Sequence, residues 1–192
     1  MAAGVEHVAH EAEHPLERLR TNRLGLWLFI ASESFLFAAL ISARYYLLGT
    51  ERSEHLNQAL GFVISLVLLT SSLFAYRAET AARFGDQRGF RRATATTIGL
   101  GLLFMVGVVL EFREGLEFFP PSTLYGSAFF TLVGFHAFHV FTGVVALAAL
   151  LWTGRDGRFG PEHHWPVEGV VKYWHFVDVA WVFIFPTLYL VK

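Results

Sequence analysis

Besides Lys172, five ionisable side chains lie inside stretches of this sequence that are otherwise apolar. They are Glu33, His136, His139, His175 and Asp178. An ionisable group that faces lipid costs several kcal/mol. These side chains must therefore face protein, lipid headgroups or trapped water, and they are candidates for hydrogen bonding, proton exchange or ligand binding.

The stretch at 168–182 reads EGVVKYWHFVDVAWV and carries two of these groups. His175 and Asp178 are three residues apart, which places them on one face of a helix. Trp174, Asp178 and Trp181 follow the i, i+4, i+7 spacing of an adjoining stripe. The spacing predicts a helix whose polar and indole groups face away from lipid.

Glu33 and His139 are predicted to lie at similar depths in a membrane. Glu33 follows the start of its apolar run by about ten residues, or about 15 Å of helix. His139 is the closer in depth of the two histidines in the GFHAFH segment, so we expect a polar contact between it and Glu33. Two interpretations of Glu33 stand equally: a proton-exchanging or lipid-facing carboxyl, and a protonated carboxyl that donates a hydrogen bond between helices.

A metal or haem site is the alternative chemistry for the histidines. A haem-copper centre needs many His ligands from several helices, and this chain offers only His136, His139 and His175 at depth. The sequence also allows a haem held by two of these histidines between the fourth and fifth spans. We expect hydrogen-bonded structural histidines and no metal.

Composition places the chain among integral membrane proteins. Of its 192 residues, 54% are hydrophobic and 16% charged, with a mean hydropathy of +0.46. A soluble domain would carry about 25% charge. The formal net charge of −1 and the pI of about 6.8 give no basic field for nucleic acid. With no cysteine, the sequence excludes disulfides and iron–sulfur clusters.

The hydropathy pattern predicts an all-α bundle of five transmembrane helices in one domain, 24–192. The expected helices cover about 24–48, 56–77, 92–112, 124–152 and 168–191. Each meets or approaches the roughly 17–25 residues that a bilayer requires. Pro120 and Pro121 should stop any helix before the fourth span, and Pro186 should bend the fifth.

Residues 1–23 are expected to form a polar N-terminal tail. The spacing of His7, His10 and His14 would suit a metal on a helix, but a solvated, partly disordered tail is the favoured interpretation. Basic residues gather in this tail and in the second and fourth loops, which would all lie on one side of the membrane. The positive-inside rule therefore predicts a cytoplasmic N-terminus and an outside C-terminus.

A second set of candidates lies before and within the start of the fifth span. Lys172 and the nearby tryptophans are ordinary interface anchors in one interpretation. In the other, slightly favoured interpretation the basic groups meet an anionic lipid phosphate. The lipid-binding candidates are Arg155, Arg158, His163, His164, Lys172 and Trp174.

Three segments together resemble one known family. WLFIASE at 27–33 resembles the helix of cytochrome c oxidase subunit III that carries its buried glutamate. YGSAFF at 125–130, running into GFHAFHV at 134–140, is similar to the family's His-containing helix. The pair His163-His164, then Glu168 and YWHFVDVAW at 173–181, resembles its C-terminal signature.

The resemblance implies a subunit of a haem-copper terminal oxidase that holds neither haem nor copper. It implies packing on the catalytic subunit I beside subunit II, phospholipid in a cleft between helices, and support of proton uptake and sustained turnover. It also implies the cytoplasmic membrane of a bacterium and an association with a respiratory supercomplex as one possibility. The polar-core and cleft candidates carried over are Glu33, His136, His139, Glu168, His175 and Asp178.

This sequence departs from the family's pattern in two ways. The long form of the family has seven spans, and this chain lacks the first two, so helices of a partner subunit would cover the missing half. Lys172 also stands where the family commonly has an apolar aromatic residue.

Three other functions stand beside the oxidase subunit. A quinol-oxidase subunit III or a homologue associated with nitric oxide reductase shares its fold. A proton or ion transporter would use Glu33, His139 and Asp178 as a relay. A membrane haem protein is the third. Co-purification separates these classes, because only a subunit leaves the membrane with a larger haem-containing partner.

Overall fold

The chain folds into helices throughout the part that the structure describes. The computed structural model describes the backbone of residues 2–50, 53 and 56–191, and the side chains of these residues from position 17 onward. No strand occurs in these ranges. The elements are α1 (Ala2–Leu48), α2 (Gln58–Arg83), α3 (Gln87–Phe118), α4 (Leu124–Thr153), a short 3₁₀ turn (Gly154–Asp156), α5 (Trp165–Phe185) and a π-helical turn (Pro186–Leu190).

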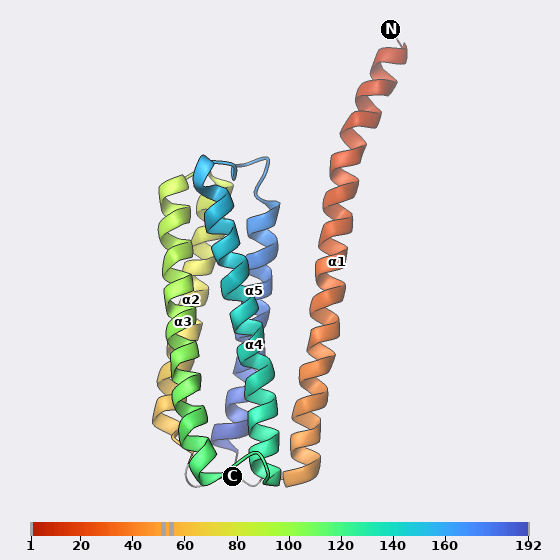
Figure 1. Ribbon diagram of the computed structural model, residues 1–192. Coiled ribbons are helices and arrows are strands. Elements are labelled where there is room, and N and C mark those ends of the chain that lie inside the picture. The colour runs from red at the N-terminus through yellow and green to blue at the C-terminus, as the bar shows by residue number, and fades with distance from the viewer. Residues whose placement is uncertain (1, 51–52, 54–55, 192) are drawn as a thin grey trace.

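Helices α2 to α5 form a bundle, and α1 stands along one side of it (Figure 1). Helix α2 packs chiefly against α3 and α5, whereas α1 contacts α4 and α5. The loops after α2 and α4 lie at one end of the bundle, and the loop after α3 lies at the other end with the C-terminus (Figure 1). The arginine-rich connections thus share one end, as the sequence predicts; which side of a membrane that end faces stays a prediction.

Helix α1 differs from its prediction at the N-terminus. It begins at Ala2 instead of near residue 24 and continues past the end of the bundle (Figure 1). The described backbone of 2–23 is thus helical, whereas a solvated, partly disordered tail is expected there from the sequence. Alanine, glutamate, leucine and arginine are frequent in this segment, and they have high helix propensity. The side chains of His7, His10 and His14 lie outside the described residues.

Four helical segments are long and apolar enough to cross a membrane. They cover Glu17–Leu48, Gln58–Arg83, Gln87–Phe118 and Leu124–Asp156, and α2 and α3 are longer than the spans predicted for them. Helix α5 is not among the four, because Glu168, Lys172 and Asp178 interrupt its apolar sequence. It packs against both α2 and α4. A fifth crossing stays a prediction.

The helix boundaries follow from local sequence signals. The side-chain oxygens of Asn57, Asp86 and Thr123 cap α2, α3 and α4 by accepting a hydrogen bond from the backbone N–H three residues later. Pro120 and Pro121 fall in the break between α3 and α4, and Pro186 begins the π-helical turn that follows α5. The predicted break at Pro120 and Pro121 is confirmed, whereas a bend at Pro186 stays a prediction.

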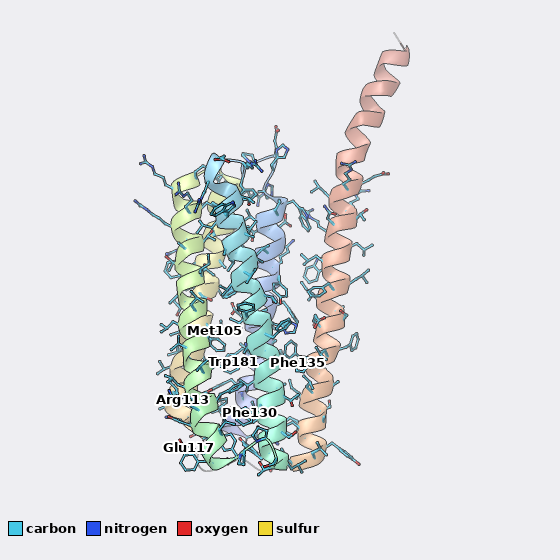
Figure 2. All side chains as sticks on the ribbon, in the orientation of Figure 1. Met105, Arg113, Glu117, Phe130, Phe135 and Trp181 are labelled. Carbon is cyan, nitrogen blue, oxygen red and sulfur yellow. The ribbon has the colours of Figure 1, made fainter. Side chains whose placement is uncertain are left out.

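The tryptophan stripe of α5 lies in the centre of the bundle. Trp174 and Trp181 are almost fully buried, and so is Asp178 between them. Trp174 Nε1 donates to Ser71 Oγ at 2.9 Å, and Trp181 Nε1 donates to Ser65 Oγ at 2.7 Å. The predicted inward orientation is confirmed, and Figure 2 shows Trp181 within the bundle. Serines of α2 satisfy the indole N–H groups that apolar packing would leave unpaired.

Two glycines leave the space that the Trp174 ring occupies. A Cβ atom on Gly101 of α3 would lie 2.7 Å from Cη2 of Trp174, and one on Gly143 of α4 would lie 2.8 Å from its Cε3. The indole thus fills the space that two missing side chains leave on facing helices. Small residues that allow such close approach are typical of packed helices in membranes.

Replacing Gly101 by alanine tests this packing. We expect Gly101→Ala to lower the stability of the bundle by about 1–3 kcal/mol, because the added methyl group overpacks against Trp174. The measurement is the thermal unfolding midpoint in detergent. Gly99→Ala is the matched control on the same helix, since nothing lies within 4 Å of a Cβ atom there. Equal midpoints for the two variants would contradict the packing role.

Candidate functional site

A cleft opens between α1, α4 and α5. It has a volume of about 730 Å³ and is lined mainly by apolar side chains, including Phe29 and Leu36 of α1 and Phe138 of α4. Phe135, which also lines it, lies on the side of α4 that faces α1 (Figure 2). Four polar side chains line the same cleft: Glu33, His139, Thr142 and Tyr173. An apolar cleft with a few convergent polar groups has the character of a ligand-binding site.

Glu33 and His139 meet in this cleft. Glu33 Oε2 lies 3.1 Å from His139 Nε2, so the polar contact predicted from the sequence is confirmed. His139 Nδ1 lies 2.7 Å from the carbonyl oxygen of Phe135, four residues earlier in α4. A carbonyl oxygen only accepts, so Nδ1 carries a proton. The contact to Glu33 then needs a second proton, either on the carboxyl group or on Nε2.

An aromatic ring packs against the His139 ring, and a hydroxyl group contacts the backbone of His139. The Phe37 ring centroid is 5.0 Å from that of His139. Tyr173 Oη donates to the backbone oxygen of His139 at 3.3 Å and lies 2.8 Å from Thr142 Oγ1. The side chain of His139 is 8% exposed and that of Glu33 is 21% exposed. The carboxyl therefore keeps the greater access to the cleft.

His136 has a different environment from His139. Its side chain is fully buried, and neither ring nitrogen has a hydrogen-bond partner among the described residues. Its ring centroid lies 4.8 Å from that of Trp181 and 5.7 Å from that of Phe104. The expectation of a hydrogen-bonded histidine is wrong here. His136 packs as an aromatic ring because α4 turns it toward the core, whereas His139 faces α1.

Asp178 and His175 are joined through Ser72 of α2. The Ser72 hydroxyl donates to Asp178 Oδ2, and its oxygen lies 2.9 Å from His175 Nδ1. A hydroxyl group has one proton, so with that proton on the Asp178 contact, His175 Nδ1 is the donor to Ser72. Asp178 shares no hydrogen bond with the Glu33–His139 pair among the described residues. The three groups suggested for a relay thus form two separate clusters.

Glu168 is the centre of an ionic cluster that ties α1 to α5. Arg23 Nη2 lies 3.1 Å from Glu168 Oε2, and Lys172 Nζ donates to Glu168 Oε1 one helical turn away. His164 Nε2 lies 3.9 Å from the same carboxylate. Arg23 and Lys172 both approach the Trp165 ring, at 5.7 and 5.9 Å from its centroid. Trp165 also lines the cleft, so this cluster borders it.

The predicted lipid-binding residues occupy several different places. Trp174 is fully buried in the core, so it offers no surface to a lipid and we do not retain it as a candidate. Arg158 and His163 are exposed in the connection between α4 and α5. Arg155 lies over the Trp152 ring, with its Cζ atom 4.1 Å from the ring centroid. Only Lys172 and His164 belong to the cluster beside the cleft.

One buried polar contact near the C-terminus, between Tyr189 and Glu111, is not among those predicted from the sequence. Tyr189 Oη donates to Glu111 Oε2 at 2.5 Å, and Gln58 Nε2 donates to the backbone oxygen of Tyr189. Glu111 lies seven residues after buried Phe104 and three after buried Val108, so it continues their stripe. That spacing was the available signal. The third span predicted from the sequence ends at about 112, so Glu111 lies at its end and resembles a residue of the membrane interface.

Among the described residues, no group of three or more His, Cys, Asp or Glu side chains is arranged to hold a metal ion. The ionisable groups instead meet serine, arginine, lysine, tyrosine or each other. Their arrangement suits proton sharing, hydrogen bonding between helices and contact with an amphipathic ligand.

The long apolar helices and their inward polar contacts define the class of this chain, a multi-pass helical membrane protein. Comparison with known proteins gives the family. A family model for cytochrome c oxidase subunit III matches residues 5–192. The chain belongs to the cytochrome c oxidase subunit III family, whose members are components of an oxidoreductase complex and not its catalytic subunit.

Individual relatives match most of the chain. Cytochrome c oxidase subunit 3 of Corynebacterium diphtheriae is 35% identical over 188 residues, which cover 92% of this chain and 91% of that protein. The protein of the same name from Synechocystis sp. is 33% identical, covering 86% of this chain and 74% of its own length. That of Thermostichus vulcanus is 31% identical, with coverages of 95% and 92%.

The Ser72 bridge predicts graded assembly defects. Ser72→Ala should weaken retention of this subunit, because it leaves Asp178 and His175 without their shared partner; interhelical bonds of this kind contribute about 1 kcal/mol. Asp178→Asn should weaken retention less, since an amide oxygen still accepts from Ser72 but more weakly than a carboxylate. The measurement is the fraction of subunit that stays with the haem-containing complex as detergent is raised.

Ser32→Ala is the control for these variants, because Ser32 is exposed and donates to the Phe29 carbonyl of its own helix. A normally assembled Asp178→Asn complex that has lost oxygen reduction would contradict this structural role and favour a chemical one.

Proposed function

We propose that this chain serves as subunit III of a cytochrome c oxidase by packing on the catalytic subunit I, beside subunit II, and holding phospholipid in the cleft between α1, α4 and α5. The bound lipid supports proton uptake and sustained turnover. The cleft itself is the observation that carries this proposal, because it combines an apolar wall with the Glu33–His139 contact. Haem and copper would then belong to the partner subunits, and phospholipid is the only bound group expected here.

The lining of the cleft fits an acyl chain. Its volume of about 730 Å³ falls in the range typical of small-molecule sites, about 300–1,000 Å³. The wall consists of phenylalanine and aliphatic side chains from three helices. Apolar surface of this kind gains nothing from contact with water, so in a membrane it is filled by lipid or by another protein.

The ionic cluster around Glu168 suits the headgroup of the same lipid. Arg23 and Lys172 bring two positive charges to one carboxylate, and Trp165 connects them to the cleft. The side chain of Arg23 is 52% exposed, so part of its guanidinium group remains available to a phosphate. His164 adds a further donor. Arg158 and His163 lie in the same connection and remain candidates for headgroup contact.

Glu33 is the group in this chain best suited to proton exchange. Its carboxyl group is partly exposed to the cleft and shares a proton with His139. A carboxyl that can exchange its proton beside lipid can collect protons for a neighbouring catalytic subunit. The cluster of Asp178, Ser72 and His175, in which Asp178 is buried and the other two residues are half-buried, joins α2 to α5 and serves assembly in this proposal.

Helix α1 supplies surface for the partners. Only 6% of its most apolar window is buried within the chain, and Trp27, Leu28 and Phe35 are exposed. Exposed apolar surface of this extent is typical of a helix that meets either lipid or another protein. Packing on subunit I and on helices of other partner subunits would account for it.

The electron donor and the location complete the proposal. Cytochrome c is the proposed donor, because the relatives carry the name cytochrome c oxidase subunit 3. A quinol oxidase is the alternative within the same fold. The proposed location is the cytoplasmic membrane of a bacterium, with the arginine-rich end facing the cytoplasm, and a respiratory supercomplex is a possible setting.

Co-purification tests the function directly. The chain is tagged, solubilised in mild detergent and captured, and a visible spectrum and a subunit gel are recorded. Haem bands that travel with a large partner, and are lost when this subunit is stripped away, are the expected result. A homogeneous, colourless chain would indicate a free-standing transporter instead. Haem remaining on the isolated chain would make His136, His139 and His175 candidate ligands.

Removing the Glu33 carboxyl tests its role in turnover. We expect Glu33→Ala to leave haem content unchanged and to shorten the active lifetime of the oxidase or reduce its retained lipid, because the variant loses both the proton-exchanging group and the His139 contact. Oxygen consumption followed to inactivation, with lipid analysis of the purified complex, measures both effects. Ser34→Ala is the control, since its hydroxyl donates to Ile30 within α1. Undiminished turnover with an unchanged lipid complement would exclude the proposed role.

A further inference from the structure

A second, positively charged groove lies at the end of the bundle where the loops after α2 and α4 meet. It has a volume of about 410 Å³ and is formed by the first turns of α3 and the last turn of α4 with the residues that follow it. The lining residues are Arg88, Arg91, Arg92, Ala95, Leu151 and Arg155. None of these residues lines the cleft between α1, α4 and α5. The two sites are therefore separate.

The three arginines at the start of α3 lie on the same side of the helix. Arg88, Arg91 and Arg92 have the i, i+3, i+4 spacing, and like charges at this spacing disfavour a helix. They also lie at its N-terminal end, where the helix dipole is positive and acidic side chains are the favourable ones. The first turn of α3 contains no acidic residue. The groove thus carries an electrostatic cost that an anion would relieve.

Within the part of the chain that the structure describes, no acidic side chain forms an ion pair with an arginine of this groove, Arg88, Arg91, Arg92 or Arg155. Asp86, the residue before α3, caps the helix by accepting a hydrogen bond from the Gly89 N–H. Arg155 is held over the Trp152 ring, an arrangement that orders its guanidinium group and leaves its charge in place.

Packing beneath the groove fixes the two helix ends relative to each other. Gln87 Nε2 donates to the Phe159 carbonyl oxygen, and the Phe90 and Phe159 rings meet edge to face at 5.4 Å. Gly154 lies beneath both rings, since a Cβ atom there would be 2.8 Å from Phe90. The arginines of α3 and Arg155 are consequently presented from a tightly packed junction.

We propose that this groove binds the phosphate of an anionic phospholipid. Guanidinium groups form paired hydrogen bonds with phosphate oxygens, and clusters of basic residues at a membrane edge attract anionic lipids. A lipid is the source of the phosphate because the same face of α3 continues as exposed apolar residues, Leu102, Val106 and Val109. An acyl chain would lie along this stripe. Exposed Trp152 beside Arg155 is typical of the membrane interface.

Spin-labelled lipids test the proposal in the intact oxidase complex. The complex is placed in phosphatidylcholine nanodiscs with a trace of spin-labelled phosphatidylglycerol or spin-labelled phosphatidylcholine, and the motionally restricted fraction is measured. We expect the protein to retain the anionic label preferentially. A variant combining Arg88→Gln, Arg91→Gln and Arg155→Gln should lose the part of this preference that the groove supplies. Arg91→Gln alone should lower the relative affinity of the groove for the anionic label about five-fold. Arg91→Lys should lower this affinity less.

The matched control removes the same number of charges elsewhere. A variant combining Arg18→Gln, Arg20→Gln and Arg83→Gln changes exposed arginines that do not line the groove, and it should keep the preference. Visible spectra and a subunit gel confirm that each complex is assembled, and the single variants replace the triple one if it does not assemble. An equal loss in both triple variants would overturn the proposal, because it would show a general charge effect.

Two further arms distinguish this lipid site from a soluble-anion site and from the cleft beside α1. Inorganic phosphate, compared with chloride at the same ionic strength, should not displace the labelled lipid; displacement by phosphate alone would show a site for a soluble anion and overturn the lipid assignment. Glu33→Ala, which alters the other cleft, should keep the groove-dependent preference. If that preference disappears in Glu33→Ala and persists in the groove variant, the anionic lipid belongs to the cleft and the groove proposal is wrong.

Discussion

The structure depends on one kind of interaction: polar side chains between apolar helices pair with another helix or with their own backbone, and His136, which packs among aromatic rings, is an exception among the described residues. Helix α5 illustrates this most clearly, because Trp174, Asp178 and Trp181 face inward and each meets a serine of α2. An unpaired polar group in hydrocarbon costs several kcal/mol. The serines of α2 therefore help to set both the rotation of α5 and its depth in the bundle.

The polar groups fall into two sets according to the helices that they join. Asp178, Ser72 and His175 join α2 to α5 within the bundle. Glu33 and His139 instead join α1 to α4 at the wall of a cleft, where the carboxyl keeps some exposure. Helix α1, attached through this contact and through Arg23 to Glu168, is the least enclosed helix of the chain. The polar groups that link α1 to the bundle thus line the cleft or border it.

The sequence predicted the contacts that depend on depth and helical spacing. The Glu33–His139 contact followed from matched depths, and the inward stripe of α5 followed from the i, i+4, i+7 pattern. It could not predict what depends on rotation between helices. His136 and His139 share a helix and are three residues apart, yet one packs among aromatic rings while the other meets a carboxylate. The groove of arginines also required the structure, because Arg155 is far from Arg88 along the chain and is brought near only by packing.

The tautomer of His139 has an electrical consequence. Because Nδ1–H is committed to the Phe135 carbonyl, one further proton lies between Nε2 and Glu33. With that proton on the carboxyl both partners are neutral, and with it on the ring they form an ion pair, so their combined charge is zero in either case. A transmembrane voltage acts on displaced charge, at about 2.3 kcal/mol per elementary charge per 100 mV across the whole membrane. Transfer of this proton over a single hydrogen bond therefore proceeds almost independently of the membrane potential, even in a membrane that is fully energised.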